Sequence, residues 1–588
     1  MGVRKLFPSL TQKYKNNIVF VRSNTEDLNQ QNIHQIDELY IDGNCLLHPV
    51  CMKTYSENKS LLRTNIKQLE MLMIVNIVTY IDDMVNIVNP STLVYISIDG
   101  VAPFAKNKQQ HSRRYKSIHE QRMIKRISKK YDQPYEQPWN NSAITPGTEF
   151  MEKITNGVIN YLRTKKKIVK EKKNVKYIFS SAYTPDEGEH KILQYIKSST
   201  KTCSRVIYGL DADLIYLSMA SEKENMFLMR EITAFQHLQS EDGYCYVSID
   251  NLKIGIFKDI KERLNDDNVD GRSFENLDLY KNRFLMDYIF FGFMIGNDFL
   301  SNIPSVNLNY DKEYSGLNVM LVAYNYAFQN INERKTSDYE FLVSNTNGFS
   351  INYLFFKEFL GFIASNEESY FRNTFRFRKK TVVKPETFED ELKVQENLQF
   401  YIPDIFKLGF KHVPHEESKR RFYEYYKMTD IDAVCEAYIE GLVWNGHYYF
   451  RECADYLWHY PYSKSPFATD LILWLLNNRE KFEQIMTKYP LQKSNKYSIS
   501  PLEQLLLVLP VQSSFLLPRQ AKSIMLKHPE TFPVKFNIDL QDISKLWQAK
   551  PMIPVPSIPL IKTLISSMSL TDKERKRNQF KSAYEITI

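Results

Sequence analysis

The first half of the chain alternates short apolar runs with longer stretches of helical periodicity. The strand-like runs cover residues 39–41, 93–98, 176–179 and 206–210. Between them, apolar residues recur at helical spacing, as in residues 66–88 and 148–162. Strands that alternate with helices are typical of a parallel sheet with helices on both faces. We therefore expect an α/β fold with a doubly wound, mostly parallel sheet.

Three of the four predicted strands are followed directly by an aspartate. These residues are Asp42, Asp99 and Asp211. An aspartate after a strand is often only a turn former or a helix N-cap. In an open α/β sheet, however, functional sites form beyond the carboxyl ends of the strands, so we expect the three side chains to converge there.

The chain has 588 residues, which exceeds one ordinary domain. We expect an N-terminal α/β region over residues 1–306 and a connecting segment over residues 307–395, which includes a basic run at 376–380. Residues 396–588 are rich in aromatic side chains and should form a largely helical region that packs on the first. A second basic run, at 163–173, is more typical of a solvated helix face than of an RNA-binding patch or a nuclear signal.

Composition is ordinary for a soluble globular protein, with 43% hydrophobic and 25% charged residues. The N-terminus has no apolar signal segment, and the most apolar stretch, 71–81, is about half the length that spans a bilayer. Because charged residues flank this stretch, we expect a buried helix there and no membrane association. The six cysteines form no CxxC pair and are interpreted as reduced thiols. These features predict an intracellular protein, cytoplasmic in the first place, with a nuclear location left open.

Acidic residues recur in five compact motifs. They are Asp42, Asp99, Glu187 with Glu189, Asp211 with Asp213, and Asp298. Seven carboxylates in one place would repel one another strongly unless cations bind between them. Carboxylate oxygens suit Mg²⁺ or Mn²⁺, and two such ions about 4 Å apart can hydrolyse a phosphodiester. The acids therefore either do not converge or hold metal, and we expect two ions.

A second group of residues points to phosphate. Lys106, Gln110, Arg113 and Arg114 follow the motif DGVAP at helical spacings of four, three and one. Arginine pairs bind phosphate bidentately, and lysine acts as a point charge. Basic amphipathic helices are common, so this spacing by itself does not establish a phosphate site. If the acids cluster, the remaining surface is more basic than the net charge of +8 suggests, and it would attract a polyanion.

Taken together, these motifs resemble the Xrn-type 5′→3′ exoribonuclease family. In the first half the resemblance is carried by YIDGN at 40–44, DGVAP at 99–103, ITPGTEF at 144–150, EGEHK at 187–191, YGLDAD at 208–213 and GNDF at 296–299. In the second half it is carried by YIEGLVW at 438–444, YPY at 460–462, SPFA at 465–468, EQLL at 503–506 and LLP at 516–518. The motifs occur in the family's order nearly from end to end.

The resemblance implies a PIN/FEN-like nuclease core that hydrolyses 5′-monophosphorylated RNA to nucleoside 5′-monophosphates during RNA decay, by two-metal-ion catalysis. The seven acids would hold the metals, and Lys106, Gln110, Arg113 and Arg114 would bind the 5′-phosphate of single-stranded RNA. His48 would stack on a leading base, with Trp444 opposite it and Trp458 as the other choice; stacking accepts any base. Structural roles for His48 and Trp444 remain open. An alternative metal cluster of Cys45, His48 and Cys51 is less favoured than core thiols beside one functional histidine.

The chain departs from the family pattern at three positions. Arg4 stands in place of a proline, Phe104 in place of an arginine, and Asp186 in place of a glycine before Glu187. None of these changes removes a catalytic residue that the resemblance implies. The long cytoplasmic relatives continue beyond this core, so we carry over no protein partner and expect a monomer.

Two other functions remain open. A structure-specific flap endonuclease also gathers acids for two metals, but it would need a helix-hairpin-helix DNA module that the sequence does not show. A non-catalytic RNA-binding scaffold on the same fold would have lost one or more acids, and none is lost.

Overall fold

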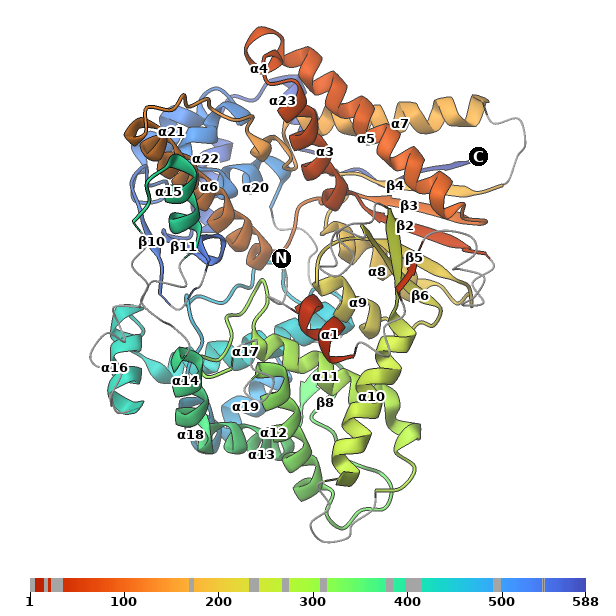
Figure 1. Cartoon of the computed structure of the whole chain (residues 1–588), viewed down its shortest axis with the longest axis vertical. Helices are drawn as coiled ribbons and strands as arrows, with labels where there is room; N and C mark the ends of the chain where they lie inside the picture. The colour runs from red at the N-terminus through yellow and green to blue at the C-terminus, as the bar shows by residue number, and fades with distance from the viewer. Residues whose placement is uncertain are drawn as a thin grey trace.

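The fold centres on one mixed sheet. The computed structural model describes residues 6–14, 20–22, 35–168, 174–231, 243–266, 274–306, 315–376, 384–397, 415–489, 499–541, 543 and 545–588. In these residues an eight-stranded sheet has the order β1-β7-β6-β5-β2-β3-β4-β12 (Figure 1). The strands are β1 (Phe20–Arg22), β2 (Glu38–Asp42), β3 (Leu93–Ser97), β4 (Lys176–Ser180), β5 (Arg205–Tyr208), β6 (Met226–Glu231), β7 (Tyr244–Ser248) and β12 (Tyr584–Thr587). Residues 1–5, 169–173 and 377–380, where Arg4 and parts of both basic runs fall, lie outside this description.

The five strands at the centre of the sheet are parallel. β2 pairs with β3 and β5, β3 pairs with β4, and β5 pairs with β6, all in parallel. The antiparallel strands β7, β1 and β12 lie toward the two edges. The predicted doubly wound, mostly parallel sheet is therefore confirmed. Because the central strands run the same way, their carboxyl ends lie along one edge.

Helices cover both faces of the sheet because alternate strand residues point to opposite sides. Leu39 and Ile41 pack with the helices α3 (Gly43–Glu57), α5 (Ile66–Val88) and α7 (Glu149–Ile168). Tyr40, between them, belongs to the other face, with the helices α8 (Gly188–Ser198), α9 (Asp213–Ala220), α10 (Ile249–Asp266) and α11 (Lys281–Ile295). A single strand thus contributes to two cores.

Helix α5 is buried along one face only. It is the one helix among the described residues that is long and apolar enough, by length and composition alone, to cross a membrane. Met73 and Ile77 are buried in the apolar cluster that α5 shares with α3 and α7, while Met71 and Val75 are 60% and 53% exposed. The predicted buried helix at 71–81 is therefore a helix that packs through one face.

The segment predicted to be a connection contributes to the largest core. It forms α12 (Gly316–Ile331), α13 (Tyr353–Ser365), α14 (Glu367–Arg376) and α15 (Phe388–Glu396), with a short hairpin of β8 (Val343–Ser344) and β9 (Ser350–Ile351). Buried side chains of α12 and α13 share one apolar cluster with α11 and with the second half of the chain. The same core thus continues across residue 306.

The second half of the chain is largely helical, as predicted. Its helices are α16 (His415–Tyr425), α17 (Ile431–Phe450), α18 (Ala468–Asn477), α19 (Arg479–Met486), α20 (Pro501–Val508), α21 (Ala521–Lys527), α22 (Ile558–Ser566) and α23 (Asp572–Arg577). α17 packs on α9 and α11, and α20 packs on α6 (Phe104–Lys130). The last strand, β12, pairs with β4 at the edge of the N-terminal sheet (Figure 1). The two halves are therefore interlocked.

Candidate active site

The predicted acids lie beyond the carboxyl ends of the parallel strands. Asp42 ends β2, and its side chain caps α3 by accepting from the backbone N–H of Asn44 at 3.2 Å. Asp99 follows β3, Glu187 is the N-cap residue of α8, and Asp213 opens α9 just after Asp211. Asp298 lies in the loop after α11. The parallel topology therefore brings four of the five motifs to one edge of the sheet, and Asp298, which follows α11, joins them through its ion pair with Lys106.

Gly188 lets three of these segments approach closely. Its backbone N–H donates to Asp99 Oδ1 at 2.7 Å. A Cβ atom at this position would lie 3.1 Å from Asp42 Oδ1 and 3.3 Å from Asp99 Oδ1. A side chain between Glu187 and Glu189 would therefore press on the acids of two neighbouring strands.

The acids are buried close enough together to perturb one another. Burial, and then the charge of Asp99, raise the pKa of Asp42 from 3.8 to about 7. Burial raises the pKa of Glu189 well above its normal value; Lys106 opposes this shift, and Glu187 adds to it. Burial and Asp298 raise the pKa of Asp213 to about 7. The isolated site therefore carries more negative charge than its cations balance, which favours binding of metal cations.

Lys106 lies within the acid cluster. Its ammonium is 2.5 Å from Glu187 Oε2 and 2.9 Å from Asp298 Oδ2, and all three side chains are nearly buried. Burial alone would raise the pKa of Asp298, but the ammonium of Lys106 holds it below normal. Lys106 thus links motifs more than a hundred residues apart. Its predicted contact with a 5′-phosphate would be made from this position, where it also lines the cavity described below.

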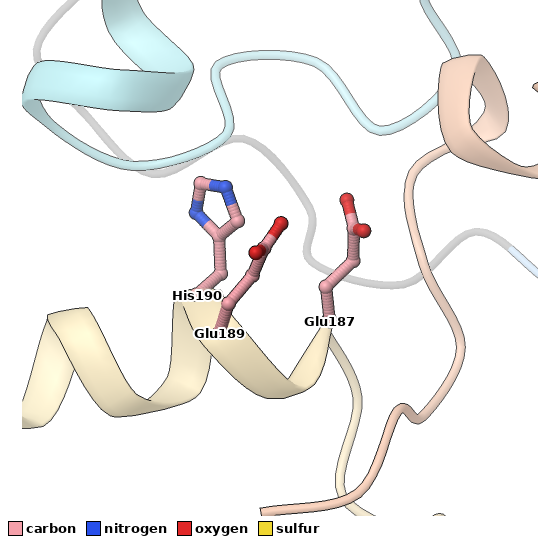
Figure 2. Close-up of side chains that lie close together, drawn as sticks. All are labelled: Glu187, Glu189 and His190. Carbon is pink, nitrogen blue, oxygen red and sulfur yellow. The ribbon is translucent and has the colours of Figure 1, made fainter. Parts of the chain in front are cut away.

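The first turn of α8 carries a potential metal-binding group. Ligand atoms of Glu187, Glu189 and His190 all lie within 4.8 Å of one another, and Figure 2 shows the three side chains on the same side of the helix. Glu189 Oε2 is buried and has no hydrogen-bond partner in the described part of the chain. Burial lowers the pKa of His190 well below normal, so the imidazole is neutral and able to bind a metal ion. These features fit a bound divalent cation.

The acids share one cavity with the predicted phosphate-binding residues. The cavity has a volume of about 360 Å³. Its lining includes the acids Asp42, Asp99, Glu187, Glu189 and Asp211. It also includes His48, Lys106, Gln110, Arg113 and Arg114, and of these Lys106 lies among the acids. Of the predicted set, Asp213, Asp298 and Trp444 lie outside its wall.

Arg114 is held firmly in the cavity wall. Its Nη2 donates to Thr145 Oγ1 at 2.7 Å, and its guanidinium also reaches the carbonyls of Asn141 and Ile144. Burial, and then the charges of Arg114 and Arg113, lower the pKa of His48 to about 3, so its imidazole is neutral. Gln110 Oε1 is buried without a partner in the described residues. The cavity therefore offers guanidinium groups, an unpaired amide and a neutral ring.

Trp444 does not line the cavity. It is fully buried, and its indole N–H donates to the carbonyl of Asp455 at 2.9 Å. The indole stacks on Tyr448 and on Trp458, with ring centroids 4.9 and 4.7 Å away. Because no surface of Trp444 is exposed, the prediction that it stacks on a base does not fit the structure. Trp458, the other choice, is partly exposed, and its role remains a prediction.

Comparison with known proteins agrees with the family resemblance that the sequence motifs indicate. The family described as XRN 5′-3′ exonuclease N-terminus matches residues 1–232, and the Xrn1 helical domain matches residues 404–586. This chain belongs to the Xrn-type 5′→3′ exoribonuclease family. It is similar to 5′-3′ exoribonuclease 1 of Schizosaccharomyces pombe (26% identity over 99% of this chain) and of Homo sapiens (25% over 98%). It is also similar to 5′-3′ exoribonuclease 2 of Arabidopsis thaliana (26% over 93%).

The chain spans only part of each of these relatives. It covers 50% of the Schizosaccharomyces pombe protein, 35% of the human protein and 64% of the Arabidopsis thaliana protein. The shared part includes both halves described above, so the Xrn comparison extends over the whole acid cluster and over α17.

Sequence reasoning missed several residues that hold this Xrn-type site together. The Tyr448 hydroxyl donates to Glu187 Oε1, and the ring packs on His190 with centroids 3.7 Å apart. Asn44 Nδ2 donates to Asp99 Oδ2 at 2.6 Å, and the Cys45 thiol donates to Asp42 at 2.9 Å. The buried ammonium of Lys191 donates to the carbonyls of Ile98, Ser180, Ser181 and Thr184. Asn44, Cys45 and Lys191 lie two or three residues after predicted acids in the sequence, whereas nothing nearby in the sequence marked Tyr448.

Two departures from the family pattern have a structural account. Asp186 adopts a φ of +81°, a region that favours glycine, and its carboxylate accepts from the Tyr456 hydroxyl. That bond ties the strained residue before Glu187 to the second half of the chain. Phe104 packs edge-on against His459, with ring centroids 4.6 Å apart, and its N–H donates to the carbonyl of Tyr456 at 2.8 Å. Both departures therefore form contacts between the two halves.

Proposed function

We propose that this protein is a metal-dependent 5′→3′ exoribonuclease that hydrolyses 5′-monophosphorylated single-stranded RNA to nucleoside 5′-monophosphates and acts in RNA decay. The observation that carries the proposal is the shared cavity, whose lining includes both the acids and a basic wall, the term used below for the part contributed by Arg113 and Arg114. Acids alone would fit many hydrolases, and a basic wall alone would fit many phosphate-binding proteins. Their combination at the carboxyl edge of the sheet supports phosphodiester chemistry next to a terminal phosphate.

The acids would hold two Mg²⁺ or Mn²⁺ ions. Bound ions of this kind lower the pKa of water and neutralise charge on the leaving oxygen. The groups on this chain fix the site in which that chemistry occurs. Tyr448 and Lys106 both contact Glu187 and would hold its carboxylate, while Asn44 and Gly188 hold Asp99.

The basic wall would select the 5′ end. Arg114 is already fixed by Thr145 and two backbone carbonyls, so little side-chain entropy would be lost when it binds phosphate. A 5′-hydroxyl would offer Arg113 and Arg114 no anionic partner, so the charge-assisted hydrogen bonds to a terminal phosphate would be lost. A triphosphate or a cap would bring further negative charge into a cavity that it shares with the acids. The same requirement for a terminal phosphate makes the reaction exonucleolytic.

Base stacking would hold the leading nucleotide without reading its sequence. His48 lines the cavity as a neutral ring, and Trp458 is the aromatic side chain that we propose opposite it. Trp444, buried behind Trp458, would act as its support.

One set of substrates tests the proposal. Purified protein with Mg²⁺ or Mn²⁺ is incubated with RNA and DNA of equal sequence that carry a 5′-monophosphate, a 5′-hydroxyl or a 5′-triphosphate, and with circular RNA. We expect mononucleotide release from monophosphorylated RNA, at least about a hundredfold faster than from the other 5′ ends. Equal rates on all ends, or cleavage of the circle, would contradict the pocket and favour an endonuclease. Binding without hydrolysis would favour the scaffold.

A further inference from the structure

A second cavity lies on the other side of helix α6. Its volume is about 320 Å³, similar to that of the catalytic cavity. Its walls come from α6, from the loop around Asp298, from residues 459–464 and from the segment near β11 (Lys550–Met552). Most of the residues that line this cavity lie outside the motifs discussed above.

The second cavity contains polar groups whose hydrogen-bonding capacity is unused within the described residues. Gln109 Oε1, His111 Nε2 and Ser301 Oγ are all buried without a partner, and all three residues line the cavity. His111 is 2% exposed, and burial lowers its pKa to about 3, so its ring is neutral. Buried polar groups without partners are rare because each costs about 1–3 kcal/mol. Three of them around one cavity indicate a ligand with both donors and acceptors, as a nucleobase has.

The charged and aromatic side chains of the cavity suit a nucleic-acid strand. The cations are Lys108, Arg113, Lys116, Lys464 and Lys550, whereas the acids are Asp298 and Asp539. Asp298 is already paired with Lys106. Trp547 is 47% exposed, and its backbone carbonyl accepts from the ammonium of Lys116. An exposed indole beside lysines is the combination that binds single strands through base stacking and phosphate contacts.

The second cavity adjoins the catalytic cavity at two points. Arg113 lines both cavities. Asp298 lines the second cavity, and Lys106, to which it is bonded at 2.9 Å, lines the first. A strand with its 5′ end in the first cavity and its first phosphodiester at the acids would therefore continue past Arg113 and Asp298 into the second.

We infer that the second cavity binds a downstream nucleotide of the RNA strand whose 5′ end occupies the catalytic cavity, with the base stacked on Trp547. This inference rests on the proposed function, because it takes the substrate to be RNA. It assigns a positioning role to side chains that touch none of the reacting groups, and it predicts that affinity depends on strand length.

Binding measured without hydrolysis tests the inference. The full-length protein in EDTA is titrated with 5′-monophosphorylated oligoadenylates of two and ten nucleotides, and with AMP as a competitor. We expect Trp547→Ala to weaken binding of the decamer about tenfold and to leave binding of the dinucleotide unchanged. Ser301→Ala, which removes a hydroxyl without a partner, should weaken only the decamer, by a few fold. Phe515→Ala is the matched control, since Phe515 is 68% exposed and lines neither cavity.

The outcomes of this titration distinguish the downstream site from the proposed activity. The inference is overturned if Trp547→Ala leaves the decamer unaffected, or if it weakens both oligonucleotides equally. It is also overturned if AMP binds in a Trp547-dependent manner while the decamer does not, because the cavity would then take a free nucleotide. If the decamer binds as expected but is not shortened when Mg²⁺ or Mn²⁺ is added, the proposed activity fails and the downstream site stands.

Discussion

Tyr448 connects the helical second half of the chain to the acid cluster, and removal of its hydroxyl should weaken metal binding. The residue lies on α17, is 3% exposed and donates to Glu187 Oε1. Its ring is enclosed by His190 and Trp444. Phenylalanine would keep this packing, so Tyr448→Phe removes one hydrogen bond and little else.

The expected magnitude follows from the kind of bond that is lost. A hydrogen bond to a charged group contributes about 1.5–3 kcal/mol. Loss of a group that orients a metal ligand typically costs about 10–100-fold in metal affinity or activity. At 1.36 kcal/mol for each factor of ten, that range corresponds to about 1.4–2.7 kcal/mol, so the two estimates agree. Glu187 would keep its ion pair with Lys106, so the side chain should stay in place but be less rigidly held.

The assay is the metal concentration that gives half-maximal hydrolysis of 5′-monophosphorylated RNA, measured for wild type and variant. Tyr489→Phe is the control, because the Tyr489 hydroxyl donates to Glu440 on the same helix at 2.7 Å, outside the catalytic cavity. We expect Tyr448→Phe to raise the half-maximal metal concentration about 10–100-fold and Tyr489→Phe to leave it unchanged. If both variants lost stability equally and neither changed the metal requirement, the proposed role of α17 in the active site would be refuted.

Three further predictions concern the acids and the basic wall. Asp211→Ala and Asp213→Ala should each reduce hydrolysis by orders of magnitude while RNA binding, followed by filter retention, persists; near-normal turnover at saturating Mg²⁺ would show that the metal assignment is wrong. Arg114→Ala should slow decay of 5′-monophosphorylated RNA far more than decay of 5′-hydroxyl RNA, which paired time courses would reveal; an equal effect on both would remove Arg114 from the phosphate site. In metal-free protein the pKa values of Asp42 and Asp213 are raised from 3.8 to about 7, so the folded state holds protons that the unfolded chain releases. Its stability should therefore fall as pH rises from about 4 to 7, as measured by urea unfolding in EDTA, and Asp42→Asn should flatten this dependence; an unchanged slope in Asp42→Asn would contradict the burial of that charge.

The sequence alone was sufficient for the local parts of this protein. Alternation of apolar runs and helical stretches predicted the strands β2 to β5 and their order with the helices, because burial on both faces of a parallel sheet imposes a local pattern. The rule that sites form at the carboxyl ends of such strands also grouped Asp42, Asp99 and Asp211 at one edge of the sheet. Spacing along one helix placed Gln110, Arg113 and Arg114 on a shared face, and all three line the catalytic cavity.

Tertiary structure decided whatever depends on contacts between distant segments. No local pattern indicated that Tyr448 would reach Glu187, that Lys106 would lie between Glu187 and Asp298, or that β12 would join the sheet beside β4. The choice between two tryptophans shows the limit most clearly. Aromatic residues suit both a core and a base-stacking surface, and only the fold determines which one is enclosed. Trp444 is buried between its neighbours on α17 and the following loop, and Trp458 keeps an exposed surface, because burial is a property of the packed chain and not of its sequence pattern.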